Sequence, residues 1–142
     1  MRLEVLCPLW IEAYAARQGR IVGMGPDDVI LSMSKMFFAY GLGNSVYLPA
    51  ASGSSVIVNE APSLPPLIND LMHQTQPTVV FGVPALYAGF LRLSEASLPP
   101  SVRFVMSAGE ALSVDLFERF RDRFGVQLID GLGATEALHF VT

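Results

Sequence analysis

The sequence has little that carries positive charge. Only 15% of its 142 residues are Asp, Glu, Lys or Arg, its formal net charge is −4, and Lys35 is the single lysine. The arginines are scattered except for Arg119, Arg121 and Arg123. Proteins that follow a phosphate backbone carry a basic patch or stripe, so nucleic acid is not an expected partner. Cys7 stands alone, which excludes an internal disulfide and a cysteine metal cluster and suits a reducing cytoplasm.

An uninterrupted apolar segment of membrane-spanning length is also missing. The longest uncharged run, residues 36–59, contains glycines, Asn44 and Pro49. The first ten residues contain one cation, and Glu4 and Pro8 interrupt their apolar stretch, which makes a poor signal peptide. We therefore expect no contact with a membrane.

Apolar residues, in contrast, are abundant. They make up 51% of the sequence, beside ten prolines and twelve glycines. The length fits one ordinary domain, and so apolar a composition is typical of the interior of something larger. No repeat, low-complexity tract or linker divides the chain, so residues 1–142 are expected to form a single structural unit.

Five short runs of Val, Ile, Leu, Met and Phe without polar alternation predict strands that are buried on both faces. Such strands belong to a parallel sheet that helices cover on both sides. The runs are DVILSM (28–33), SSVIVN (54–59), TVVFGV (78–83), VRFVMSAG (102–109) and VQLIDG (126–131).

Helix signals separate these runs. Ser63 is the expected cap of one helix, Pro84 opens a second, and Ser113 caps a third that Gly125 ends. Residues 8–24 fit a further amphipathic helix that ends near Gly23. The side chains expected to face the core are Leu67, Ile68, Leu71 and Met72, then Leu86, Phe90 and Leu93, then Phe117, Phe120 and Phe124. Strand and helix alternate, which predicts an α/β fold with a mostly parallel sheet and crossover helices.

Ligands of open α/β sheets bind beyond the carboxyl ends of the strands. Three segments at or near such ends are rich in small and polar residues: FAYGLGNS (38–45), SAGEALS (107–113) and DGLGATE (130–136). These three segments are the candidate site.

Two phosphate-binding patterns are excluded by single features. In DGLGATE, a dinucleotide fingerprint would need a third glycine where this sequence has Glu136, and a separate segment, ASGSS (51–55), lacks the Gly-Lys-Ser/Thr ending of a P-loop. The glycines of DGLGATE still permit close backbone approach, the Thr135 hydroxyl suits a phosphate oxygen, and the Glu136 carboxylate suits Mg²⁺. Spacing alone leaves open the alternative of a tight turn with a solvated Glu136.

Four segments together resemble the adenylate-forming superfamily. DGLGATE resembles its Asn/Asp-x-x-Gly-x-Thr-Glu motif, MSAGEAL (106–112) its adenine-side loop, and KMFFAYGLGNSVYLP (35–49) its aromatic-acid segment. TVVFGVPALYAGFL (78–91) resembles its strand and Val-Pro-x-Leu helix. Most members have tyrosine where this sequence has Leu132, and an aliphatic residue there resembles the benzoate-CoA and hydroxybenzoate-CoA ligase branch.

The resemblance covers roughly residues 12–142 and implies residue roles. Thr135 would bind the α-phosphate and Glu136 would hold Mg²⁺, and these two residues would be the catalytic ones. The implied adenine contacts are Ala108, Gly109, Glu110, Asp130, Gly131 and Leu132, and the implied aromatic-acid pocket consists of Ala39, Tyr40, Gly133, His139 and Phe140. A core aromatic remains the alternative for Tyr40, and a structural histidine the alternative for His139. His73 is expected to be a surface residue.

The reaction that the resemblance implies has two steps. The carboxylate of a small aromatic acid attacks the α-phosphate of ATP, and a thiol, that of CoA, then displaces AMP from the acyl-adenylate. Such catalysis depends on positioning and on neutralising phosphate charge.

The family's phosphate loop with its lysine is missing upstream, and its small C-terminal domain would follow Thr142. Residues 1–142 are therefore expected to form a partial AMP-binding domain that does not catalyse ligation alone, because Lys35 cannot replace the missing lysines. Unpaired sheet edges favour self-association, or complementation by the missing parts. A non-catalytic remnant that binds a nucleotide or a partner is the alternative.

Overall fold

The computed structural model describes residues 16–134, apart from 18 and 21, and the backbone of residues 140–141. Its elements are β1 (Val29–Ser32), α2 (Ala39–Leu42), the π-helix η1 (Gly43–Tyr47), α3 (Leu48–Ser52), β2 (Ser55–Ile57), α4 (Pro65–Thr75), β3 (Val79–Gly82), α5 (Pro84–Arg92), β4 (Phe104–Ser107), α6 (Val114–Phe124), β5 (Gln127–Asp130), β6 (Leu132–Gly133) and β7 (Phe140–Val141).

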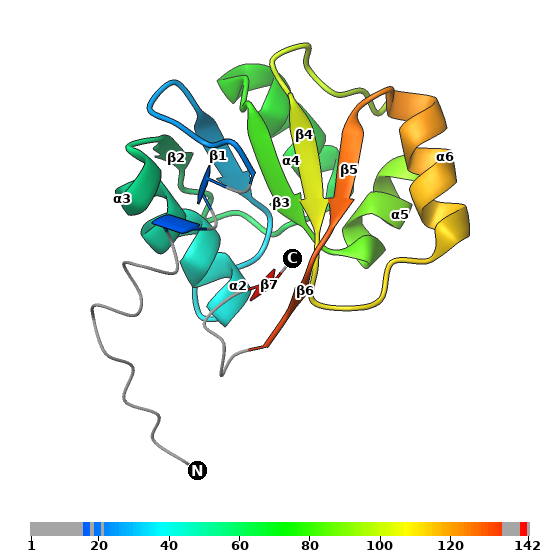
Figure 1. The fold of residues 1–142 in the computed structure, drawn as a ribbon. Coiled ribbons are helices and arrows are strands. Elements are labelled where there is room, and N and C mark those ends of the chain that lie inside the picture. The colour runs from blue at the N-terminus through cyan, green and yellow to red at the C-terminus, as the bar shows by residue number, and fades with distance from the viewer. Residues whose placement is uncertain (1–15, 18, 21, 135–139, 142) are drawn as a thin grey trace.

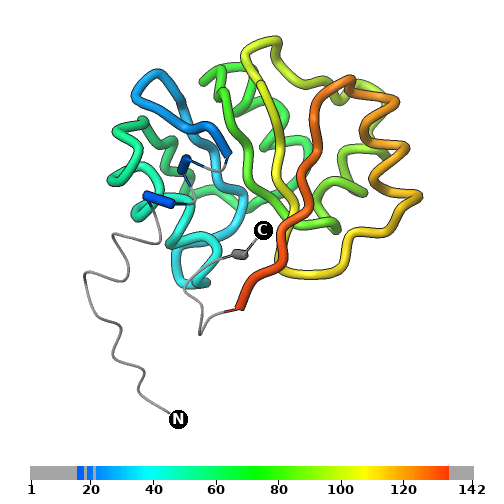
Figure 2. Tube along the Cα trace, viewed as in Figure 1, coloured from blue at the N-terminus to red at the C-terminus, as the bar shows by residue number. Residues whose placement is uncertain are grey.

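Five strands form one parallel sheet in the order β2-β1-β3-β4-β5 (Figure 1). Each of them lies within one of the five apolar runs, so the predicted parallel α/β fold is confirmed. β6 and β7 form a separate antiparallel pair. Figure 2 shows the chain leaving β5 and running from the sheet toward the cyan segment that contains α2. This path brings the last predicted motif toward the aromatic-acid segment.

Successive residues of each strand point to opposite faces of the sheet, and two cores result. Leu31, Val80 and Val105 pack under α4, α5 and α6 on one face. Ile30, Phe81 and Met106 pack on the other face, against Tyr40 of α2, Tyr47 of η1 and Leu48 of α3. The sheet therefore lies between two helical layers, as strands without polar alternation predict.

The helix ends follow the sequence signals in two places. The Ser113 hydroxyl accepts a hydrogen bond from the Leu116 N–H at 3.3 Å, and Gly125 ends α6 in the left-handed region. Before β1, the Met24 N–H donates to the carbonyl of Gly19 and the Gly23 N–H to that of Arg20, the paired bonds of a Schellman motif. The helix predicted over residues 8–24 lies mostly outside the described residues, but its predicted end near Gly23 is confirmed.

The prediction that Ser63 caps a helix is wrong. α4 begins at Pro65, its N-cap is Leu64, and no side chain caps it. A capping serine accepts from the backbone N–H groups two and three residues later, and here both positions are prolines, which have none. The Ser63 hydroxyl instead donates to the carbonyl of Met33 at 2.6 Å and ties the start of this helix to the end of β1.

Of the helices that the structure describes, none is long and apolar enough to cross a membrane. The longest uncharged run of the sequence instead forms the short helices α2, η1 and α3 and the edge strand β2. Gly41 allows this segment to turn closely on itself, because a Cβ at that position would lie 2.1 Å from the carbonyl oxygen of Lys35.

An ion pair between buried Asp28 and half-exposed Arg103 closes the amino ends of the strands. The Asp28 carboxylate accepts hydrogen bonds from the Thr78 hydroxyl at 2.6 Å, the Gly25 N–H at 2.9 Å and the Arg103 guanidinium at 2.8 Å. Burial by itself raises the pKa of Asp28, but these hydrogen bonds and the charge of Arg103 outweigh it, and the pKa lies below its usual value. The ion pair lies at the amino ends, so it does not occupy the opposite end of the sheet, where the strands have their carboxyl ends.

Candidate functional site

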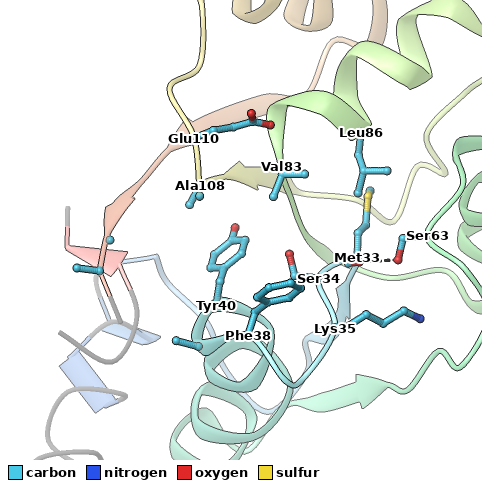
Figure 3. A pocket seen from close by; sticks show the side chains of 14 residues that line it. Met33, Ser34, Lys35, Phe38, Tyr40, Ser63, Val83, Leu86, Ala108 and Glu110 are labelled. Carbon is cyan, nitrogen blue, oxygen red and sulfur yellow. Dashed lines mark hydrogen bonds between the residues drawn. The ribbon is translucent and has the colours of Figure 1, made fainter. Parts of the chain in front are cut away.

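A cavity of about 690 Å³ lies beyond the carboxyl ends of the strands (Figure 3). The segments after β1, β3 and β4 meet there with α2 and with residues of the last motif. Six predicted site residues line it: Ala39, Tyr40, Ala108, Gly109, Glu110 and Gly133. The structure therefore brings together parts of all three segments that the sequence singled out.

The predicted adenine-side loop, Ala108–Glu110, begins where β4 ends. The Ala108 N–H donates to the carbonyl of Gly82 at 3.2 Å, which fastens the loop to β3. Gly109 has φ +93°, a conformation that L side chains rarely adopt, and a Cβ there would lie 3.5 Å from Val83. Glycine is thus required to turn the backbone along the cavity wall.

Glu110 also contributes its side chain, which the sequence analysis did not predict. One oxygen of its carboxylate accepts a hydrogen bond from the Ala85 N–H at 3.1 Å, in the first turn of α5. Backbone N–H groups in the first turn of a helix lack partners within the helix, and the helix dipole favours a negative charge there. The carboxylate therefore ties the adenine-side loop to α5.

The other predicted adenine contacts, Asp130, Gly131 and Leu132, flank the cavity without lining it. Asp130 lies beside Ser107 in the register of β4 and β5, and the Gly131 N–H donates to the Ser107 carbonyl at 2.8 Å. The Leu132 side chain is 77% exposed. The two halves of the predicted adenine site are thus joined through the end of β4, and Leu132 leaves apolar surface beside it.

Tyr40 lies both at the cavity and against the core. Its ring lines the cavity and also packs edge-on against Phe81 in the core, with ring centroids 6.2 Å apart. Its hydroxyl lies within the protein and donates to the carbonyl of Met106 at 3.3 Å. Burial raises the pKa of this hydroxyl far above its usual value, with a further rise from Asp130 and an opposing effect of the Asn44 amide. Tyr40 is therefore neutral at any physiological pH.

Lys35 and Phe38, from the predicted aromatic-acid segment, also line the cavity, together with residues outside the three candidate segments: Met33, Ser34, Ser63, Val83 and Leu86. Figure 3 shows the Tyr40, Phe38 and Ser34 side chains pointing toward the ends of β3 and β4. Most of these added residues directly follow the carboxyl ends of β1 and β3. The strand-end rule would have found them if it had included the first residues after each of these two strands.

The Lys35 side chain extends away from Tyr40 (Figure 3). Its ammonium donates to the carbonyl oxygens of Asn59 at 3.1 Å, Glu60 at 3.4 Å and Ala61 at 2.5 Å. An ammonium has three donors, so these bonds occupy it fully. This geometry agrees with the inference that Lys35 does not act on phosphate.

Thr135, Glu136 and His139 lie outside the described residues, and Phe140 is described only as backbone in β7. Their predicted roles stay predictions, including Mg²⁺ binding by Glu136. Within the described part of the chain, no group of three His, Cys, Asp or Glu side chains is placed to hold a metal ion. His73 is exposed and lies 3.0 Å from the Ser97 hydroxyl, in agreement with its prediction as a surface residue.

The chain is similar to enzymes that activate aromatic acids. It is 46% identical over 112 residues to the p-hydroxybenzoic acid-AMP ligase of Mycobacterium marinum, covering 78% of this chain and 16% of that protein. It is 39% identical over 121 residues to the benzoate-CoA ligase of Thauera aromatica, covering 84% of this chain and 23% of that protein. It thus spans less than a quarter of the length of these relatives.

Solved structures agree with this similarity. A benzoate CoA ligase from Burkholderia xenovorans LB400 superimposes with a TM-score of 0.84 at 37% identity, over 92% of this chain and 27% of that one. The anthranilate CoA ligase AuaEII, solved with anthranoyl-AMP, superimposes with a TM-score of 0.84 at 28% identity, over 92% and 26% of the two chains. Residues 10–142 match the family described as AMP-binding enzyme, and the chain belongs to this family.

Proposed function

We propose that this chain forms the aromatic-acid and adenine subsites of an AMP-forming aryl-acid ligase. The observation that carries the proposal is the single cavity that joins Ala39 and Tyr40 to the adenine-side loop, Ala108–Glu110. An acyl-adenylate consists of an aromatic acid and AMP in one molecule, so its two parts need adjoining subsites. A volume of about 690 Å³ lies within the range of small-molecule sites.

The residues divide between the two parts of this ligand. Ala108, Gly109 and Glu110 suit a flat base, because Gly109 has no side chain and its backbone can approach the base closely. The exposed Leu132 side chain at the flank of the cavity would become buried against the adenine, which removes apolar surface from water. Ala39, Tyr40 and Gly133 leave room for a flat ring, and His139 and Phe140 complete the proposed acid pocket.

The proposed reaction has two steps. The acid carboxylate displaces pyrophosphate from the α-phosphate of ATP, and the thiol of CoA then displaces AMP from the carbonyl carbon. Thr135 would hydrogen-bond the α-phosphate, and Glu136 would hold the Mg²⁺ that neutralises phosphate charge. The described residues would contribute by orienting the acid and the adenine.

For the 142 residues by themselves, we propose ligand binding without ligation. Neutralising the charge at the α-phosphate takes a cationic side chain in addition to Mg²⁺, and the single lysine is held by the carbonyl groups of residues 59–61. This observation favours, for the isolated chain, the second candidate function of a nucleotide-binding protein without catalysis.

We also propose that the isolated chain self-associates or binds complementing segments. Phe37, Phe38 and Val58 are 80%, 59% and 63% exposed. Within the described sheet, β2 and β5 each pair on one side, so each presents a free edge. Concentration-dependent sedimentation would test this, and a strictly monomeric chain at 100 µM would contradict it.

A stable adenylate analogue tests the proposed binding. Isothermal titration of the chain with benzoyl-sulfamoyl adenosine is expected to show saturable binding at about one ligand per chain. Gly109→Ala should weaken binding at least 10-fold, because strain at φ +93° distorts the adenine-side loop. Gly125→Ala is the matched control, because it also replaces a left-handed glycine but lies at the end of α6.

The two variants should lose similar stability, and only Gly109→Ala should lose affinity. Equal losses of affinity, or no binding by the unchanged chain, would refute the proposed site. ATP/pyrophosphate exchange with benzoate tests the second part of the proposal. Robust exchange by the isolated chain would refute the proposed lack of catalysis.

A further inference from the structure

Two tyrosines from opposite faces of the sheet donate to the same carbonyl oxygen. Tyr40 approaches Met106 from the α2 side at 3.3 Å, and Tyr87 of α5 approaches it from the other core at 2.6 Å. Met106 lies in β4, two residues before Ala108. One backbone group thus receives a side chain that lines the cavity and a side chain that does not.

Tyr87 has little freedom to move. Its side chain is 1% exposed, and its ring packs against Phe120 of α6, with centroids 5.0 Å apart. Gly82 makes room for it, because a Cβ there would lie 2.9 Å from the Tyr87 hydroxyl oxygen. A buried hydroxyl must find a partner, and the carbonyl of Met106 is that partner. Tyr87 therefore holds this carbonyl in place from the core side.

Tyr40 is held at its hydroxyl end as well. One helical turn further on, the Asn44 amide lies near this hydroxyl and is fully buried. Within the described part of the chain, neither polar atom of this amide has a hydrogen-bond partner of regular geometry. The Tyr40 hydroxyl thus lies inside the protein and donates to Met106, while its ring faces the cavity.

We propose that Tyr87 is a positioning residue for the aromatic-acid subsite, acting on Tyr40 through the carbonyl of Met106. The inference rests on the proposed function, since it assigns Tyr40 to the acid. It has a consequence for specificity, because this hydroxyl lies inside the protein and donates its proton to Met106, so the ligand does not reach it. Tyr40 therefore presents its ring to the acid, and its hydroxyl does not distinguish benzoate from hydroxybenzoate.

Four variants of the 142-residue chain test this inference: Tyr87→Phe, Tyr40→Phe, the double variant, and Tyr47→Phe as a control tyrosine on the α2 face. Each is titrated with benzoyl-sulfamoyl adenosine and with sulfamoyl adenosine, which lacks the acid. Tyr87→Phe should weaken the benzoyl compound about 5-fold and the acid-free compound less than 2-fold. In the Tyr40→Phe background the same change should have no further effect.

Equal weakening of both compounds by Tyr87→Phe, or independent effects of the two substitutions, would overturn the inference, because both indicate a structural role alone. An unchanged affinity in Tyr87→Phe would overturn it too. Tyr40→Phe should alter the preference between benzoyl and 4-hydroxybenzoyl compounds less than 2-fold. A 10-fold change would show that the Tyr40 hydroxyl contacts the substituent on the ring, against the inference.

Unfolding in urea separates this inference from the proposed function. If the unchanged chain binds neither compound, the proposed function fails, and the coupling between Tyr40→Phe and Tyr87→Phe in unfolding midpoint still decides whether the two tyrosines act together. Additive midpoint shifts would then overturn the linkage through Met106.

Discussion

Substituting Gly41 by alanine should disrupt the acid subsite more than its size suggests. The added Cβ would lie 2.1 Å from the carbonyl oxygen of Lys35 and 2.7 Å from that of Ser34, whereas ordinary contact begins at 3.4 Å. Both neighbours are backbone atoms, so no side-chain rotation relieves the clash, and the two segments must separate by about 1.3 Å.

The magnitude follows from two opposing effects. Alanine gains about 1 kcal/mol over glycine within a helix, whereas overpacking costs about 1–3 kcal/mol and more where backbone must move. We therefore expect Gly41→Ala to lower the unfolding free energy by about 2 kcal/mol. The shift also moves Ala39 and Tyr40 away from the strand ends, so affinity for benzoyl-sulfamoyl adenosine should fall at least 10-fold.

Urea unfolding followed by circular dichroism measures the stability, and isothermal titration measures the affinity. Gly25→Ala is the control, because its Cβ would meet no heavy atom within 4 Å and its backbone has no positive φ. It should change stability by less than about 0.5 kcal/mol. A Gly41→Ala chain as stable as the control, with unchanged affinity, would refute the close packing of α2 against residues 34–35.

Three further substitutions test other parts of the structure. Asp28→Asn should lower the unfolding free energy by about 2 kcal/mol near neutral pH. This value lies between those of exposed and buried ion pairs, because the Arg103 side chain is 45% exposed. The pKa of Asp28 in the folded chain lies below its usual value of 3.8, so this difference in unfolding free energy should be constant above about pH 5 and shrink as acid protonates the carboxylate. A difference that stays constant down to pH 2 in urea unfolding would contradict the assignment. Lys35→Met should make residues 59–61 more susceptible to limited proteolysis, and an unchanged cleavage rate would show that the three carbonyl contacts do not hold this segment. Ser113→Ala should lower the unfolding free energy by about 1 kcal/mol through the lost helix cap, with Ser113→Asp restoring it.

The sheet and the strand-end loops could be predicted because their signals are local. A run such as Val79–Gly82 is apolar on both faces, and that alone indicates a buried parallel strand. The turn at Gly109 is likewise announced by its residue type. The alternation of strands and helices and the handedness of crossovers limit the possible strand orders but do not select one. The register depends on packing between segments that are far apart in the sequence.

The missed features depend on residues far apart in the sequence. Glycine is unfavourable within a helix, yet Gly41 lies in α2. The position requires glycine because a Cβ there would clash with the carbonyl oxygen of Lys35. The Glu110 carboxylate binds a backbone N–H 25 residues away, and Tyr87 is fully buried although the stripe expected on its helix was Leu86, Phe90 and Leu93. Side-chain polar contacts across a fold have no periodicity that a sequence could reveal.

β4 connects the two proposed subsites. Its last residues hold both: the carbonyl of Met106 receives Tyr40 on the acid side, the carbonyl of Ser107 receives Gly131, and Ala108 begins the adenine-side loop. β4 pairs with β3 on one side and β5 on the other, so it is held along both sides and only small local shifts of its last residues are open to it. In the proposed site, a strand held on both sides would fix the distance between acid and adenine, and a substitution that moves the Met106 carbonyl should weaken a joined adenylate more than it weakens either part alone.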